Sequence, residues 1–154
     1  MIQLYKEDRA NMINKLGWIK KQFIEHNSEE LKEGYVFTVD GELLEYNSFQ
    51  PLGWYDVEID SLLRESSEDV DNCPPIACCT CGCIECDSVC AFVEFTDNFV
   101  TWTIFEVNIC GDKESVMNSN MGKYWFEKEQ YFQVINSLNA IIEKDELEWK
   151  KKQG

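Results

Sequence analysis

Cysteines are the residues with the clearest potential for chemistry, and six of the eight lie between Cys78 and Cys90. This stretch reads Cys-Cys-Thr-Cys-Gly-Cys-Ile-Glu-Cys-Asp-Ser-Val-Cys. Closely spaced thiols bind zinc, form disulfides, or stay reduced and pack as small apolar side chains. All three interpretations remain open from the sequence, and we place reduced thiols first.

Structural zinc is the second interpretation. Cys83 and Cys86 form a Cys-x-x-Cys pair, and Gly82 provides a turn that resembles a zinc knuckle. A four-thiolate site normally takes two such pairs from separate segments, whereas here the thiols are crowded into one segment. If zinc binds, the expected ligands are Cys79, Cys81, Cys86 and either Cys83 or Cys90.

Disulfides are the third interpretation. The first residues lack the basic and apolar regions of a secretory signal, so an oxidising compartment is not expected. The neighbours Cys78 and Cys79 cannot aim their sulfurs at each other along a strand, although a pair such as Cys81 with Cys86 is feasible across a hairpin.

No enzymatic chemistry is expected. The single histidine, His26, falls at the end of the predicted first helix, where a lone histidine is usually a surface residue. Cysteine–histidine catalysis needs the two side chains within hydrogen-bonding reach, and nothing in the sequence indicates that. The chain also lacks a glycine-rich phosphate loop, a His-Glu-x-x-His zinc motif and a nucleophile elbow.

Helices are predicted at both ends of the chain. From Lys6 to His26 apolar residues recur at helical spacing, and they include Met12, Leu16, Ile19 and Phe23. Gly17 interrupts this pattern at a cost of about 1 kcal/mol relative to alanine. A second helix is predicted from Lys128 to Lys150, where six apolar residues form a stripe. They are Tyr131, Val134, Ile135, Leu138, Ile141 and Ile142.

A first hairpin is predicted from Tyr35 to Tyr46. Asp40-Gly41 is a strong signal for a two-residue turn, which would place Phe37 opposite Leu44 and Tyr35 opposite Tyr46. Gly53–Ile59 is a further strand candidate, because Tyr55, Val57 and Ile59 alternate with acidic residues.

A second hairpin is predicted around Asp97-Asn98, between strands at 89–95 and 99–107. The pairs Ala91–Ile104, Val93–Trp102 and Phe95–Val100 would then share one apolar face. A strand is also expected at 76–81, a loop at 113–123 and an edge strand at 124–126. These elements predict a single α+β domain over 1–154, with an antiparallel sheet of five to six strands and one helix at each end.

The charge balance is strongly acidic, with 29 acidic and 14 basic residues and a formal net charge of −15. Phosphate backbones repel such a surface, so direct nucleic-acid binding is not expected. We expect a soluble, cytoplasmic protein without membrane spans. Acidity can serve solubility alone, or it can steer the protein toward a basic partner.

Two motifs stand out in the second half of the chain: Cys79-x-Cys81-Gly82-x-x-x-Cys86 and, after it, Val100-x-Trp102. These motifs, with the segment from Phe126 to Tyr131, resemble a group of uncharacterised bacterial proteins over roughly the second half of the chain. The resemblance implies a shared architecture for that half, and it implies no activity.

The function expected from these features is that of a non-enzymatic immunity or inhibitor protein that neutralises a basic, nuclease-like toxin or a nucleic-acid-binding partner. The residues expected to meet the partner are the acidic loop residues Glu65, Glu68, Asp69 and Asp71. Trp54, Tyr55 and Trp125 are candidate anchors, although a tryptophan is more often core. The alternative is a structural or adaptor module that requires zinc to fold.

Overall fold

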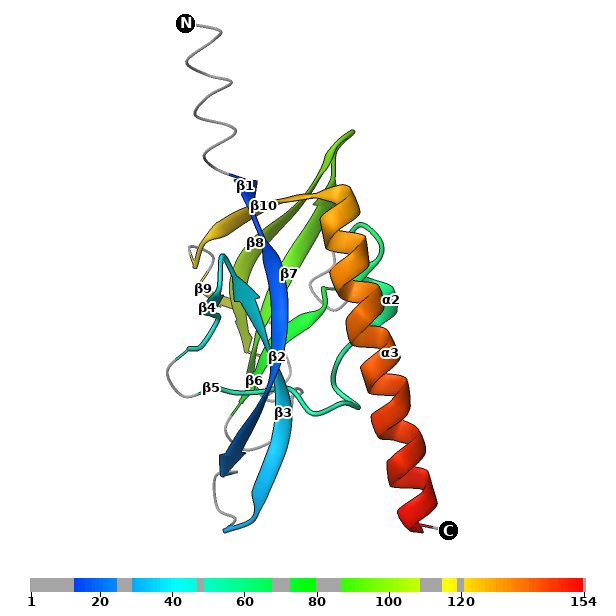
Figure 1. Ribbon diagram of the computed structural model, residues 1–154. Coiled ribbons are helices and arrows are strands. Elements are labelled where there is room, and N and C mark those ends of the chain that lie inside the picture. The colour runs from blue at the N-terminus through cyan, green and yellow to red at the C-terminus, as the bar shows by residue number, and fades with distance from the viewer. Residues whose placement is uncertain are drawn as a thin grey trace, which may run out of the picture.

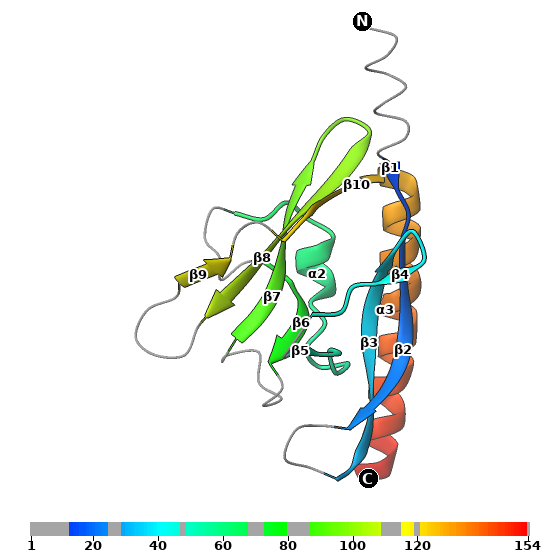
Figure 2. The ribbon, with the colours of Figure 1, turned by 90° about the vertical axis from the view of Figure 1, so that its left-hand side faces the viewer.

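The computed structural model describes residues 13–24, 29–46, 49–67, 73–79, 87–108, 115–118 and 121–153. These residues form a larger sheet, a smaller sheet and a long C-terminal helix that runs beside the smaller sheet (Figures 1 and 2). The elements, in chain order, are β1 (Ile13–Asn14), β2 (Leu16–Ile24), β3 (Leu31–Val39), β4 (Glu42–Leu43), β5 (Phe49–Gln50), α2 (Ile59–Leu62), β6 (Pro75–Cys79), β7 (Asp87–Phe95), β8 (Phe99–Asn108), β9 (Ser115–Asn118), β10 (Lys123–Glu127) and α3 (Lys128–Gln153). The α+β class is therefore confirmed.

The larger sheet has seven strands in the order β1-β10-β8-β7-β6-β5, with β9 pairing alongside β8. Its centre is the β7–β8 hairpin, in which Val93 pairs with Trp102 and Ala91 with Ile104, as predicted. Thr96 N donates to Phe99 O at 2.8 Å and closes the turn. The apolar residues of these two pairs are fully buried, so one face of the hairpin supplies the core.

The smaller sheet has the order β2-β3-β4, and its β3–β4 turn is the predicted one. Asp40 and Gly41 both have positive φ, 54° and 83°, as a type I′ turn requires. Leu44 N donates to Phe37 O at 2.9 Å, which confirms that pairing. The predicted Tyr35–Tyr46 pairing is wrong, because Tyr35 instead exchanges backbone hydrogen bonds with Leu52 at 2.8 and 3.1 Å.

The predicted N-terminal helix is wrong over the described residues, where β1 and β2 take its place. β2 pairs with β3 along its whole length, from Leu16 opposite Val39 to Ile24 opposite Leu31. Gly17 explains part of the difference, because a Cβ at this position would lie 2.5 Å from Thr38 Oγ1. The glycine that is unfavourable in a helix therefore leaves room for the Thr38 side chain on the paired strand.

Three further predictions need correction. Gly53–Ile59 is not a strand, because Trp54–Asp56 form a turn and α2 begins at Ile59. The predicted loop at 113–123 contains β9, which pairs with β8. The segment at 124–126 is a strand, as predicted, but it is not an edge strand: β10 has β8 on one side and β1, in parallel orientation, on the other.

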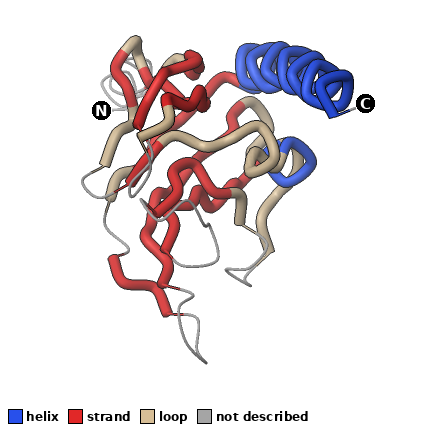
Figure 3. Tube along the Cα trace, turned by 90° about the horizontal axis from the view of Figure 1, so that it is seen from below, coloured by secondary structure: helices blue, strands red, loops and turns tan. Residues whose placement is uncertain are grey.

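The helix α3 confirms the prediction and extends it to Gln153. Figure 3 shows α3 and α2 on one side of the molecule and the strands on the other. The buried residues of α3 belong to one apolar cluster with residues of both sheets; they are Tyr131, Ile135, Leu138 and Ile142. Neither helix in the described part of the chain has the length and apolar content needed to cross a membrane.

Trp102 lies at the centre of this cluster and is fully buried. Its ring makes edge contacts with Phe37, Phe126 and Tyr131 at centroid distances of 5.2, 5.3 and 6.1 Å. Its indole N–H donates to the Tyr131 hydroxyl at 3.1 Å, and that hydroxyl donates to Leu62 O at 2.5 Å. The indole N–H and the Tyr131 hydroxyl are thus paired within the core, and these contacts join β3, β8, β10, α2 and α3.

Candidate functional site

The cysteine stretch is only partly described by the structure. Cys81, Cys83 and Cys86 lie outside the described residues, so the predicted zinc set stays a prediction. Cys79 lies in β6, opposite Phe49 of β5. Among the described residues, no group of three or more histidine, cysteine, aspartate or glutamate side chains could hold a metal ion.

Cys90 is described in full, and its surroundings favour a neutral thiol. It is 5% exposed and belongs to a small apolar cluster with Cys73, Phe105 and Val107. Burial raises the pKa of the Cys90 thiol to about 12, although the hydrogen bond to Ser88 Oγ at 3.4 Å works in the opposite direction. In these surroundings the thiol packs as a small apolar side chain, and its predicted role as a zinc ligand stays a prediction.

The predicted acidic contact loop is also only partly described. Glu68, Asp69 and Asp71 lie outside the described residues, whereas Glu65 is exposed, as predicted. Its carboxylate accepts a hydrogen bond from Phe95 N at 3.1 Å, and the adjacent Ser66 Oγ accepts one from Val93 N at 2.9 Å. Glu65 therefore helps cover the end of β7 that extends beyond its pairing with β6, a structural task that the sequence did not suggest.

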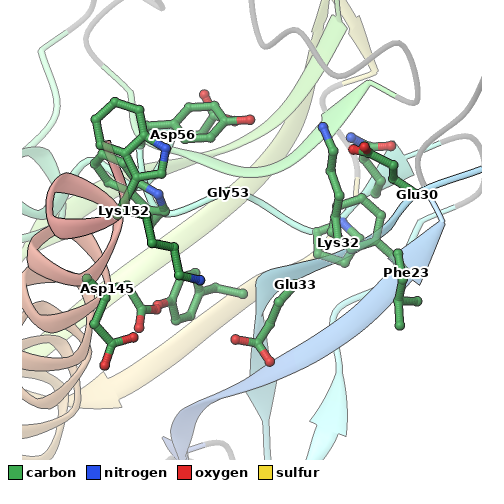
Figure 4. Close-up of a pocket in the computed structure, with 16 residues that line it drawn as sticks. Phe23, Glu30, Lys32, Glu33, Gly53, Asp56, Asp145 and Lys152 are labelled. Atoms are coloured by element: carbon green, nitrogen blue, oxygen red, sulfur yellow. The ribbon is translucent and has the colours of Figure 1, made fainter. Parts of the chain in front are cut away.

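A groove of about 640 Å³ lies at the end of the molecule where α3, the β2–β3 hairpin and the segment after β5 meet (Figure 4). One wall comes from the hairpin, with Phe23, Glu30, Lys32, Glu33 and Tyr35 among its residues. Figure 4 shows the hairpin residues on one side and Asp145 and Lys152 of α3 on the other, with Gly53 between them and Asp56 near Lys152.

Aromatic side chains form one side of the groove. The Trp54 ring lies 5.6 Å from that of Tyr55 and 5.8 Å from that of Trp149, between centroids. Tyr55 is 65% exposed and Trp149 48% exposed. Large aromatic surfaces left in water beside a hollow are typical of binding sites, because burial by a partner recovers their hydrophobic free energy.

Carboxylates outnumber ammonium groups in the lining, five to two. The acids are Glu30, Glu33, Asp56, Asp145 and Glu148, and the bases are Lys32 and Lys152. The groove therefore has the same sign of charge as the chain as a whole, and a concave site with this charge concentrates cations.

Asp145 anchors α3 to the hairpin. Its carboxylate accepts hydrogen bonds from the Tyr35 hydroxyl and from Lys20 Nζ, and Lys20 Nζ also lies 3.5 Å from Glu33. Burial alone would raise the pKa of Asp145, but the Tyr35 hydroxyl and the Lys20 ammonium outweigh it and lower that pKa. The same contacts raise the pKa of Lys20 against the opposing effect of burial. This network joins the helical wall of the groove to its hairpin wall.

Asp56 differs from Asp145 because no cation neutralises it among the groups that set its pKa. Burial raises the pKa of Asp56, a hydrogen bond from the Gly53 backbone opposes that shift, and nearby Glu58 adds to it. A carboxylate in such surroundings gains from a cation brought close to it.

The sequence did not predict this groove. Two of the three anchor candidates, Trp54 and Tyr55, line it, whereas Trp125 lies elsewhere, against Phe99 and Lys123. Their role as anchors stays a prediction. The α3 residues Asp145, Glu148, Trp149 and Lys152 were missed, although their spacing places them on one helical face.

Comparisons of the chain with protein-family models, with curated proteins and with solved structures found no match. The resemblance of the second half to a group of uncharacterised bacterial proteins therefore stays a prediction.

Proposed function

We propose that this chain is a non-enzymatic binding protein that recognises a basic protein and neutralises it, in the manner of an immunity or inhibitor protein. The partner class is a nuclease-like toxin or another protein whose surface binds nucleic acid. Such a surface is built to meet phosphates, and an array of carboxylates can occupy it in their place.

The groove at the end of α3 is the observation that carries this proposal. It combines an excess of carboxylates with two strongly exposed aromatic rings, Tyr55 and Trp149. Aromatic anchors provide most of the binding energy in protein interfaces, and surrounding charges select the partner and speed its approach.

The ion pairs of the described residues leave much of the acidity available. Lys20 pairs with Asp145 and Glu33, Lys21 with Glu45, and Lys150 with Glu146. Each ion pair takes up a basic residue, and the chain has only 14 basic residues for 29 acidic ones. Many carboxylates must therefore remain without a basic partner. A net charge of −15 on 154 residues is expected to attract a basic protein over several ångströms beyond contact.

The test is to isolate a partner by cross-linking in cells that make the protein, purify it and measure association by stopped flow at rising salt. We expect a basic partner whose association rate constant falls at least about tenfold between low and high salt, because charges that steer encounter are screened. The dissociation rate constant should change much less, and it serves as the internal control.

The partner's own activity provides the second measurement. An equimolar amount of this protein should suppress nucleic-acid binding or cleavage by the partner. An acidic partner, an association rate that does not respond to salt, or a partner whose nucleic-acid activity is unaffected would contradict the proposal.

A further inference from the structure

We propose that the groove between α3 and the β2–β3 hairpin binds an arginine side chain of the basic partner, with the guanidinium group between the Trp149 ring and the Glu148 carboxylate. This inference rests on the proposed function and assigns it a recognition element. It follows from the size of the groove, its aromatic surface and its excess of carboxylates.

The size of the groove suits a short peptide segment. A hollow of about 640 Å³ falls within the range of pockets that enclose small ligands, roughly 300–1,000 Å³. The groove is partly open to solvent, so an extended side chain can enter it from a partner surface.

The aromatic surface suits a flat cation. Trp149 projects from α3 and contacts Trp54, which in turn contacts Tyr55. Guanidinium groups stack on indole faces and are more weakly hydrated than ammonium groups, so they lose less by leaving water. Trp149 is half exposed, and it therefore offers ring surface to a ligand.

The two carboxylates that α3 contributes to the groove differ in whether a cation already pairs with them. Asp145 is already engaged by Tyr35 and Lys20. Glu148 lies one residue before Trp149, and within the described part of the chain it takes part in none of the ion pairs. Of these two, Glu148 is the carboxylate better able to accept two hydrogen bonds from a guanidinium fork.

Lys152 provides a test of the sign of the ligand's charge. It lies one helical turn beyond Glu148, on the same face of α3, and it lines the groove. An incoming arginine must approach this ammonium group at a cost in repulsion. Removal of the Lys152 charge should therefore strengthen binding of a cation. It would weaken binding of an acidic ligand and leave the affinity for a neutral ligand unchanged.

The probe is a short capped peptide, acetyl-Gly-Arg-Arg-Gly-amide, titrated into the full chain and followed by the indole N–H signals in NMR spectra. A peptide with citrulline in place of arginine keeps the shape and removes the charge, and a lysine peptide keeps the charge and removes the fork. We expect the arginine peptide to bind most tightly and to shift the signals of Trp54 and Trp149.

The variants have matched controls on the same helix. Trp149→Ala should weaken binding about fivefold, as loss of one exposed cation–π contact predicts, and Glu148→Gln about threefold. Lys152→Gln should strengthen it about twofold. Leu147→Ala removes a side chain that is 59% exposed outside the groove, and Glu143→Gln removes an equal charge outside it, so both should change affinity by less than about twofold.

Each other outcome overturns the inference. If Glu148→Gln and Glu143→Gln weaken binding equally, or only other tryptophan signals shift, the attraction is general and the groove is not the site. Equal affinity for the lysine peptide would overturn the assignment to arginine. Absence of binding at millimolar peptide would overturn the groove site. None of these outcomes tests the proposed function, which is tested separately by the salt dependence of association with the whole partner.

Discussion

Two aromatic clusters in this protein use the same residue types for opposite purposes. Around Trp102 the rings are buried, make edge contacts from several elements and satisfy their polar atoms within the core. Around Trp149 the rings line a groove, remain partly in water and lie among carboxylates. The first arrangement gains free energy on folding, whereas the second leaves hydrophobic free energy to be gained on binding.

The largest expected effect separates these two clusters directly. Trp102→Ala should lower the free energy of unfolding by about 3–5 kcal/mol, because it removes a fully buried ring and leaves a cavity. Trp149→Ala should lower it by about 1 kcal/mol or less, since half of that ring already contacts water. Urea denaturation followed by circular dichroism measures both values.

A milder substitution keeps this comparison measurable if Trp102→Ala does not fold. Trp102→Phe preserves most of the apolar volume but removes the donor to the Tyr131 hydroxyl, so a loss of about 1–3 kcal/mol is expected. Equal losses for the Trp102 and Trp149 substitutions would show that the groove is a structural part of the core, and the contrast between the clusters would fail.

The second prediction concerns the β2–β3 pairing, which carries the hairpin wall of the groove. Gly17→Ala should destabilise the protein by about 1–3 kcal/mol, because the added Cβ would lie 2.5 Å from Thr38 Oγ1, a contact that overpacks a close strand pair. The measurement is again the free energy of unfolding.

The double variant Gly17→Ala with Thr38→Ala is the control, because it removes the atom that the new Cβ would meet. It should recover much of the loss relative to Thr38→Ala alone. If Gly17→Ala is neutral or stabilising, the strand pairing of this segment is wrong and the helix that its apolar spacing suggested regains support.

The strand pairings show which parts of the fold could be predicted from the sequence and which could not. The pairing of Val93 with Trp102 was predictable, because a two-residue turn fixes the register of the strands that flank it. The partner of β2 was not, since Leu16, Ile19 and Phe23 fit a helical spacing and β3 lies beyond a connecting segment. A local pattern cannot distinguish a helix from a strand whose neighbour is specified elsewhere.

The groove was harder to predict for a related reason. Its walls come from Phe23 near one end of the chain, from Trp54 and Tyr55, and from Glu148 and Trp149 near the other end. Sequence indicated that some tryptophans could be anchors but could not tell the buried Trp102 from the exposed Trp149. That difference arises only when distant segments pack, so it is a property of the tertiary structure.

The smallest expected effect concerns the Asp145 network, which joins the helical wall of the groove to the hairpin wall. Asp145→Asn should cost about 1 kcal/mol or less at neutral pH, because the site is partly open to water and screening reduces its value. The pKa of Asp145 is lower in the folded chain than in the unfolded one, so folding favours its ionised form. This contribution is present above the unfolded pKa, about 3.9, and is lost as the pH falls through the folded value.

Unfolding free energies of the wild type and of Asp145→Asn should therefore converge as the pH is lowered below about 4 and stay separated at higher pH. Glu143→Gln, on the same helix and outside the network, is the control and should follow the wild type. If Asp145→Asn also leaves the affinity for the arginine peptide unchanged, the network holds the walls without contacting the ligand. A difference between the two proteins that persists at low pH would show that Asp145 acts through packing, and the groove would then resemble the Trp102 cluster more closely than its exposure suggests.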